Sequence, residues 1–242
     1  MTDSVKIGSN QNASELDRHG KIGTLREFGR IFLQLAMLFI SAGRLSWINA
    51  WVYAGLILIL QLVYTIVLIN LNPQLLNERG KGFKKGTKSF DIAVLISFFL
   101  MFYVTLIISG LDAGRYGWSD MSFLGNILGA AVLVLAFIFI LWAMTANTHF
   151  EGTVRIQDDR DHKVCSSGPY RIVRHPGYTG MIFATLGTPL ILSSWWGLVP
   201  AGAAVFLIML RTMLEDRTLQ NELTGYPEYA KQTRHRLIPF VW

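Results

Sequence analysis

The sequence predicts an all-α fold, a polytopic transmembrane bundle of five to six membrane helices. The last two helices are expected to form a hairpin, and a small cytoplasmic lobe is expected beside the bundle. Of the 242 residues, 52% are hydrophobic and only 16% are charged, whereas soluble domains average about 25% charged residues. The apolar residues cluster into long uncharged runs, and the lysines and arginines alternate between the loops. This pattern excludes a disordered chain, a nucleic-acid-binding domain and, with Cys165 as the single cysteine, a disulfide-stapled secreted module.

Four uncharged runs reach the length of about 20 residues that a membrane-spanning helix needs. They cover residues 45–77, 92–111, 121–150 and 175–210. The last run is too long for one helix and contains Pro189 and a break at 193–197, so it predicts a hairpin of two helices. The first arm of this hairpin, roughly 178–192, is short for a full membrane crossing. A further run at 31–43 fits either a marginal span or a helix in the membrane interface.

The positive charges predict which ends of these helices face the cytoplasm. Taken segment by segment, the 22 lysines and arginines are distributed 5, 1, 5, 1, 5, 0 and 5 along the chain. Loops rich in lysine and arginine stay on the cytoplasmic side, so a chain that crosses the membrane an even number of times shows this alternation. Both termini are therefore expected in the cytoplasm, in the inner membrane of a bacterium or the endoplasmic reticulum of a eukaryote. Residues 1–27 are expected to form a cytoplasmic tail without a signal-peptide core, and residues 28–146 the N-terminal membrane helices.

Two polar segments follow, at 149–178 and 211–236, and we expect them to fold together over the last four helices. In the first, two X-Pro units place Arg174 and His175 at the start of a helix. Such a position suits an anionic group, although arginine and tyrosine also serve as plain membrane-edge anchors. In the second, Arg211 and Glu215 lie four residues apart on one helix face. They form either a simple ion pair or part of a cavity at the membrane boundary.

Three stretches of these segments combine into a specific pattern: His162-x5-Gly168-Pro169-Tyr170-x3-Arg174-His175-Pro176-x-Tyr178, then Arg211-x3-Glu215-Asp216-x2-Leu219, then Gly225-Tyr226-x2-Tyr229 with Arg236-Leu237-Ile238-Pro239. The pattern resembles the isoprenylcysteine carboxyl methyltransferase family of integral-membrane enzymes, which use S-adenosylmethionine. The resemblance covers about residues 150–242 and departs at Asp216, where a second glutamate is commoner. It implies that 147–242 is a methyltransferase-like catalytic region in which the polar lobe holds the cofactor.

The resemblance also implies a site. Arg211 would contact the carboxylate of the acceptor as the catalytic residue, and no metal is expected. The cofactor S-adenosylmethionine would be held by Gln157, His162, Lys163, Val164, Cys165, Tyr170, Arg174, His175, Pro176, Gly177, Tyr178 and Glu215. The acceptor would be a lipophilic compound entering from the bilayer, such as an isoprenylcysteine or a similar prenyl or lipid compound, methylated to an ester. A carboxylate is ionised at neutral pH, so this reaction needs no general base.

Three other functions fit parts of the sequence. A phospholipid or lipid-amine N-methyltransferase would share the architecture, but Arg211 would repel a cationic amine. An NADPH-dependent sterol-type reductase carries a similar arginine-histidine-proline stretch and could use Lys163, Arg171 and Arg174 on phosphates. A non-enzymatic scaffold or small transporter is the third. The spans are nearly free of charge, and their few amides include Gln34, Asn49, Gln61 and Asn126, which favours an enzyme working at one face of the membrane.

Overall fold

The computed structural model describes residues 15–242 as a bundle of helices. The α-helices are α1 (Arg18–Ala42), α2 (Ile48–Leu71), α3 (Pro73–Gly80), α4 (Ser89–Ser109), α5 (Phe123–Ala146), α6 (Pro176–Ile191), α7 (Leu198–Glu222) and α8 (Tyr226–Gln232). A π-helical turn, η2 (Gly110–Tyr116), continues α4, and two 3-10 turns, η3 (Asp158–Arg160) and η4 (Gly168–Arg171), lie between α5 and α6. No strand is formed in the described residues, which confirms the predicted all-α class.

Four helical segments are long and apolar enough to cross a membrane: α2, α4 with η2, α5 and α7. Their outward faces expose large apolar side chains such as Leu62, Leu100, Leu135 and Phe206. Exposed apolar surface of this extent is what contact with lipid tails requires. With its 16 residues, α6 is too short to cross the roughly 30 Å hydrocarbon core alone, as the sequence predicted for the first arm of the hairpin.

The first helix begins earlier than the sequence division suggested. The side chain of Asp17 accepts a hydrogen bond from the backbone N–H of Gly20 at 2.8 Å and caps α1. Residues 18–27 of the expected tail are therefore helical, and residues 1–14 lie outside the described part of the chain. Because its first turns carry Arg18, Lys21 and Arg26, only the second half of α1 is apolar.

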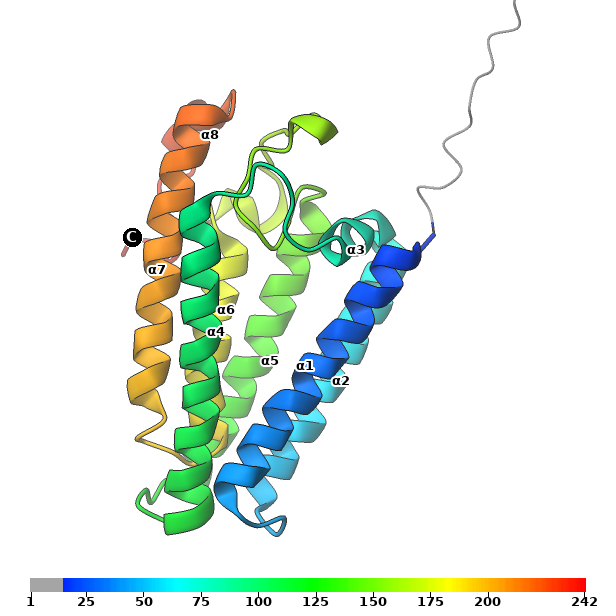
Figure 1. Ribbon diagram of the computed structural model, residues 1–242. Coiled ribbons are helices and arrows are strands. Elements are labelled where there is room, and N and C mark those ends of the chain that lie inside the picture. The colour runs from blue at the N-terminus through cyan, green and yellow to red at the C-terminus, as the bar shows by residue number, and fades with distance from the viewer. Residues whose placement is uncertain (1–14) are drawn as a thin grey trace, which may run out of the picture.

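Helices α1 and α2 are tilted relative to the rest of the bundle. In Figure 1, both lean away from α4, α6 and α7 toward the end of the bundle where α3 and α8 lie. At the other end the α6–α7 turn is held by amides: Asn126 and Asn49 donate to Ser193 Oγ at 2.7 and 2.6 Å. The turn confirms the predicted hairpin. Helices α5 and α6 approach closely because Gly129 lacks a Cβ, which would lie 2.6 Å from the backbone nitrogen of Ile191.

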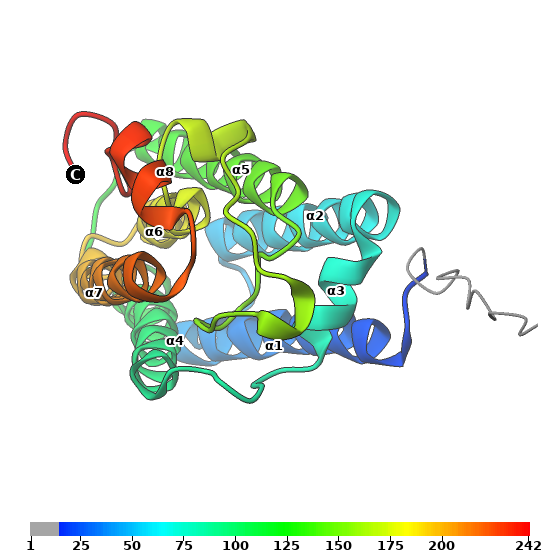
Figure 2. The same cartoon turned by 90° about the horizontal axis from the view of Figure 1, so that it is seen from above.

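The two polar segments join into a lobe at the end of the bundle marked by α3 and α8. The backbone N–H groups of Arg174 and His175 donate to the carbonyls of His235 and Arg236, each at 2.9 Å. The Tyr229 hydroxyl donates to the carbonyl of Tyr170 at 2.7 Å. Seen from above, the connection from α5 to α6 crosses between α2 and α3 on one side and α6 and α8 on the other (Figure 2). The expected pairing of the two segments is therefore confirmed.

Candidate active site

One large cavity of about 560 Å³ lies beneath this lobe. That volume falls within the range typical of ligand sites, about 300–1,000 Å³. All thirteen residues that the sequence implicated line it: Gln157, His162, Lys163, Val164, Cys165, Tyr170, Arg174, His175, Pro176, Gly177, Tyr178, Arg211 and Glu215. The fold thus brings residues separated by more than 50 positions to a single site.

The opposite wall of the cavity comes from helices that precede residue 147, a part of the chain that carried no recognised motif. Apolar side chains from α2, α4 and α5 extend the cavity toward the middle of the bundle, among them Ile57, Phe98, Leu133, Phe137 and Ile140. Sequence reasoning missed these residues because a lining side chain and a core side chain share the same apolar character. The cavity is therefore polar under the lobe and apolar inside the bundle.

The lobe is anchored by Asp216, which is fully buried on α7. Its carboxylate accepts from Arg174 at 2.8 and 3.0 Å, from Arg236 at 2.9 Å and from the Tyr226 hydroxyl at 2.9 Å. His175 Nε2 lies 3.2 Å from the same carboxylate. A buried carboxylate with this many donors fixes the geometry of the groups around it.

This network changes the interpretation of Arg174. Its guanidinium also donates to the backbone carbonyls of Thr233 and Arg234, so four of its five N–H groups are used within the protein. In the structure this side chain joins the lobe to Asp216, and its predicted contact with the cofactor stays a prediction that at most one free N–H group could make. Burial also raises the pKa of the neighbouring Tyr226 hydroxyl, so it stays protonated and donates to Asp216.

Arg211 and Glu215 do not pair with each other. Arg211 instead binds Asp91, at the start of α4, with Nε–Oδ1 and Nη2–Oδ2 distances of 2.6 and 3.2 Å, and Nη2 also donates to the Gly152 carbonyl at 2.8 Å. The simple ion pair considered from their spacing is therefore wrong, and the alternative of a cavity wall is supported. Within the described residues, only Nη1 of this guanidinium has no hydrogen-bond acceptor.

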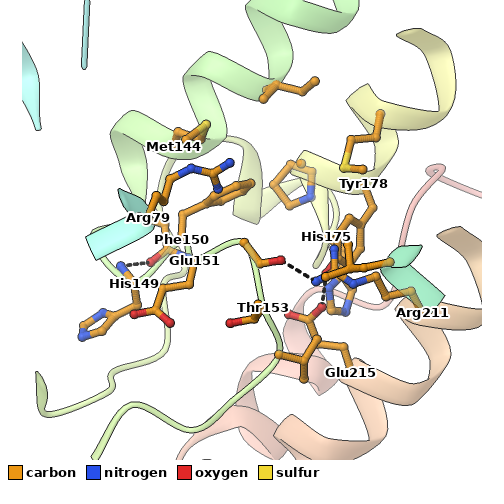
Figure 3. Close-up of a pocket in the computed structure, with 18 of the residues that line it drawn as sticks. Arg79, Met144, His149, Phe150, Glu151, Thr153, His175, Tyr178, Arg211 and Glu215 are labelled. Carbon is orange, nitrogen blue, oxygen red and sulfur yellow. Dashed lines mark hydrogen bonds between the residues drawn. The ribbon is translucent and has the colours of Figure 1, made fainter. Parts of the chain in front are cut away.

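Glu215 faces the cavity beside Tyr178, whose hydroxyl donates to its carboxylate (Figure 3). The ring of Tyr178 is stacked on His175 at 5.7 Å, and the Arg211 guanidinium carbon lies 4.9 Å from its centroid. Among residues 15–242, no cationic side chain lies within 4.0 Å of Glu215. Its carboxylate is therefore available to a cationic ligand.

The loop from 157 to 165 contributes Gln157 and residues 162–165 to the lining of the cavity. The Gln157 amide donates to the His149 carbonyl at 2.7 Å and so holds the loop. His162 is stacked on His149 at 4.9 Å, and burial together with that neighbour lowers its pKa to about 4, so it is neutral at pH 7. The Lys163 side chain is exposed and pairs with Asp161 at 2.7 Å.

The remaining predicted loop residues are held by α5. The Cys165 thiol donates to the carbonyl of Ala146 at 3.3 Å, and the Tyr170 hydroxyl accepts from Asn147 at 3.2 Å. Burial raises the pKa of the Tyr170 hydroxyl, which therefore stays protonated. Val164 packs in the same apolar cluster as Tyr170 and Tyr226. These contacts position the loop over the cavity, and within residues 15–242 the Cys165 thiol has only a carbonyl and a hydroxyl as hydrogen-bond partners.

Gly177 is needed because Phe150 approaches it closely. A Cβ at this position would lie 2.5 Å from the Phe150 ring. We expect Gly177→Ala to push the ring into the cavity and to weaken ligand binding about tenfold, since overpacking costs about 1–3 kcal/mol. Calorimetric titration with S-adenosylhomocysteine checks this, with Gly202→Ala, where a Cβ meets open space, as the control. Unchanged affinity in Gly177→Ala would show that the ring has room elsewhere.

Comparisons with known proteins find similar sequences among methyltransferases. Residues 124–224 match a family model described as phospholipid methyltransferase. A "Probable protein-S-isoprenylcysteine O-methyltransferase" of Oryza sativa subsp. indica is 28% identical over 128 residues, which is 50% of this chain and 62% of that protein. "Protein-S-isoprenylcysteine O-methyltransferase A" of Arabidopsis thaliana is 27% identical over 64% of this chain and 76% of its own length. The chain thus spans somewhat less than two thirds of the rice relative.

A solved structure shares the fold. The eukaryotic intramembrane Ras methyltransferase ICMT, an isoprenylcysteine carboxyl methyltransferase, matches with a TM-score of 0.52 at 18% identity, over 87% of this chain and 74% of that one. The fold and the cavity define an integral membrane protein with a ligand site at one end of its helix bundle. In sequence the chain is similar to protein-S-isoprenylcysteine O-methyltransferases, and it shares the fold of the solved methyltransferase ICMT.

Proposed function

We propose that this chain is a membrane-embedded carboxyl O-methyltransferase that moves a methyl group from S-adenosylmethionine to the carboxylate of an isoprenylcysteine or a similar prenylated or lipidic acid. One observation carries the proposal. The thirteen residues implicated by the motifs line a single cavity that is polar under the lobe and apolar inside the bundle. A water-soluble cofactor and a lipid-borne acceptor can meet only in a site of this kind.

The residues of the cavity fit S-adenosylmethionine. When bound, it supplies a methyl group on a positively charged sulfonium. Glu215 has no cationic partner in the described residues, so its carboxylate suits a cationic or hydroxyl-bearing part of the cofactor. Neutral His162 and the loop around it would enclose the rest. Other loop residues contribute shape, because their polar atoms are used within the protein.

The chain needs only to align and to desolvate the reactants. The acceptor carboxylate is already ionised at neutral pH. Bound S-adenosylmethionine would supply the methyl group and a neutral thioether as the leaving group, so the residues of this chain need only to hold a carboxylate oxygen next to that methyl group. Arg211 can donate one hydrogen bond to the carboxylate from Nη1, while Tyr178 and the apolar wall exclude water. Asp91 holds the Arg211 guanidinium in that orientation.

The family-model description gives weight to one alternative, transfer to the amine of a phospholipid. An amine must first lose a proton, and the cavity presents Arg79 to it, a cation with no carboxylate within 4.0 Å in the described residues. This charge raises the free energy of an ammonium group there. The reductase alternative is not favoured either, because its proposed phosphate-binding cations Arg174 and Lys163 are paired with Asp216 and Asp161.

We also propose that the lobe and both termini face the cytoplasm. The lysine- and arginine-rich segments at 79–88, 155–174 and 211–236 contribute to this end of the bundle, whereas the opposite turns carry almost no positive charge. Positive-inside sorting supports that orientation. Cysteines introduced singly at Asp158 and at Trp195, with Cys165 replaced by serine, would test it in sealed vesicles, since only the side open to an impermeant maleimide is labelled.

Direct binding tests the proposed function. We expect the purified protein to bind S-adenosylhomocysteine in calorimetric titration and not NADPH. Glu215→Gln should weaken S-adenosylhomocysteine binding by about tenfold to a hundredfold, because a hydrogen bond to a charged group contributes about 1.5–3 kcal/mol. Glu228→Gln, an exposed change on α8, is the matched control. Binding of NADPH alone would exclude a methyltransferase, and an unchanged affinity in Glu215→Gln would remove that residue from the cofactor site.

A further inference from the structure

The charges that line the cavity are nearly all neutralised within the protein. The partners of Lys163, Arg174 and Arg211 are Asp161, Asp216 and Asp91. The other pairs are Glu27 with Arg30, Glu78 with Lys84, and Glu151 with Arg155. Within residues 15–242, only two lining charges have no opposite charge within 4.0 Å, the carboxylate of Glu215 and the guanidinium of Arg79.

Arg79 lies in the last turn of α3, on the wall opposite the motif residues. Its guanidinium carbon is 5.9 Å from the centroid of the Phe150 ring. Figure 3 shows Arg79, Phe150 and Met144 on one side of the cavity and Tyr178, Arg211 and Glu215 on the other. The two unneutralised charges, of opposite sign, therefore face one cavity from different sides.

The surroundings of Arg79 suit a ligand that has an anionic group at one end and an apolar chain at the other. The side chain is half-buried, so an anion bound to it would be partly shielded from water. Met144 and Phe150 pack with Leu75 and Leu76 of α3, and Met144 continues into the apolar wall formed by Ile140 and Phe137. A molecule that placed an anionic group on Arg79 could extend its apolar part along this wall without leaving the cavity.

We propose that Arg79 is the charge partner of the acceptor's carboxylate and so determines the preference for an anionic acceptor. The inference rests on the proposed methyltransferase function and deepens it. Arg211 cannot supply that charge by itself, because Asp91 neutralises it in a bidentate pair. The cationic cofactor then lies toward Glu215 and the anionic acceptor toward Arg79. Each ligand meets the lining charge of opposite sign that has no ion-pair partner in the described residues.

Paired measurements on the full-length protein in detergent test this inference. The probes are an N-acetylated S-prenylcysteine as methyl acceptor, its methyl ester as a neutral competitor, and S-adenosylhomocysteine. We expect Arg79→Gln to raise the KM for the acid about tenfold or more, because a charge-assisted contact is lost. Ester inhibition and S-adenosylhomocysteine affinity should stay unchanged, and Arg79→Lys should recover part of the loss. Arg26→Gln, an exposed cation that contacts the α3 backbone outside the cavity, is the control.

The other outcomes overturn the inference in recognisable ways. Equal weakening of acid and ester would mean that Arg79 acts by packing on Phe150. Weaker S-adenosylhomocysteine binding with an unchanged acid KM would assign Arg79 to the carboxylate of the cofactor. If the unaltered protein binds no S-adenosylhomocysteine, the proposed function itself fails, which is a separate result from the effect of Arg79.

Discussion

Replacing Asp216 with alanine is expected to disrupt the lobe and abolish S-adenosylhomocysteine binding. Asp216 is 0% exposed and is the common acceptor for Arg174, Arg236 and Tyr226. Removing it leaves the guanidinium of Arg174 buried without a counter-charge. Breaking a buried ion pair in this way costs about 3–5 kcal/mol, a large part of the stability of about 5–15 kcal/mol that a folded domain has.

Thermal unfolding and limited proteolysis in detergent check this expectation. Cleavage should concentrate in residues 147–175 and 223–242, because these segments join through backbone hydrogen bonds beside Asp216. Asp158→Ala, which removes an exposed carboxylate from the same lobe, should leave both measurements unchanged. A melting temperature and a cleavage pattern in Asp216→Ala equal to those of the unaltered protein would mean that the lobe does not depend on this network.

The sequence predicted the membrane helices and the hairpin because local patterns determine them. Long uncharged runs mark α2, α4, α5 and α7, and Pro189 with the break after it marks the end of α6. Two local signals were available but not used. Asp17 caps α1, and Asn72 caps α3 with Pro73 at its first position, so both helix starts could have been read from the sequence.

The site was predicted only as far as its motifs extend. The motif residues gather at one cavity because the two polar segments carry them and pair with each other. The partners of those residues could not be predicted, since Asp91 and Arg211 are 120 positions apart and no periodicity connects them. Asp91 does stand at the edge of an uncharged run, where an acidic residue is a functional candidate. Arg79 gave no signal, because it is one of several cations in a polar connection.

Asp91→Asn is the second change expected to have a large effect, because it breaks the buried pair with Arg211. Asp91 is 0% exposed, and its carboxylate also accepts from the Val154 backbone N–H at 2.8 Å. Its loss should destabilise the protein by about 3–5 kcal/mol and detach the loop from α4. Arg211→Gln leaves Asp91 buried without a counter-charge and should cost a similar amount. The double variant should be more stable than the sum of the two single changes predicts, because neither charge is left without its partner.

The double variant also decides what Arg211 does. The sequence resemblance assigns it to the acceptor carboxylate, whereas its geometry gives it a structural partner and leaves only Nη1 for a ligand. If Arg211 contacts the acceptor, the double variant should bind S-adenosylhomocysteine normally and still fail to methylate an N-acetylated S-prenylcysteine. If Arg211 serves only to hold Asp91 and the loop at Gly152, the double variant should be more stable than the single variants and should also methylate the acceptor. Measuring the melting temperature, S-adenosylhomocysteine affinity and turnover on the same preparations separates these results.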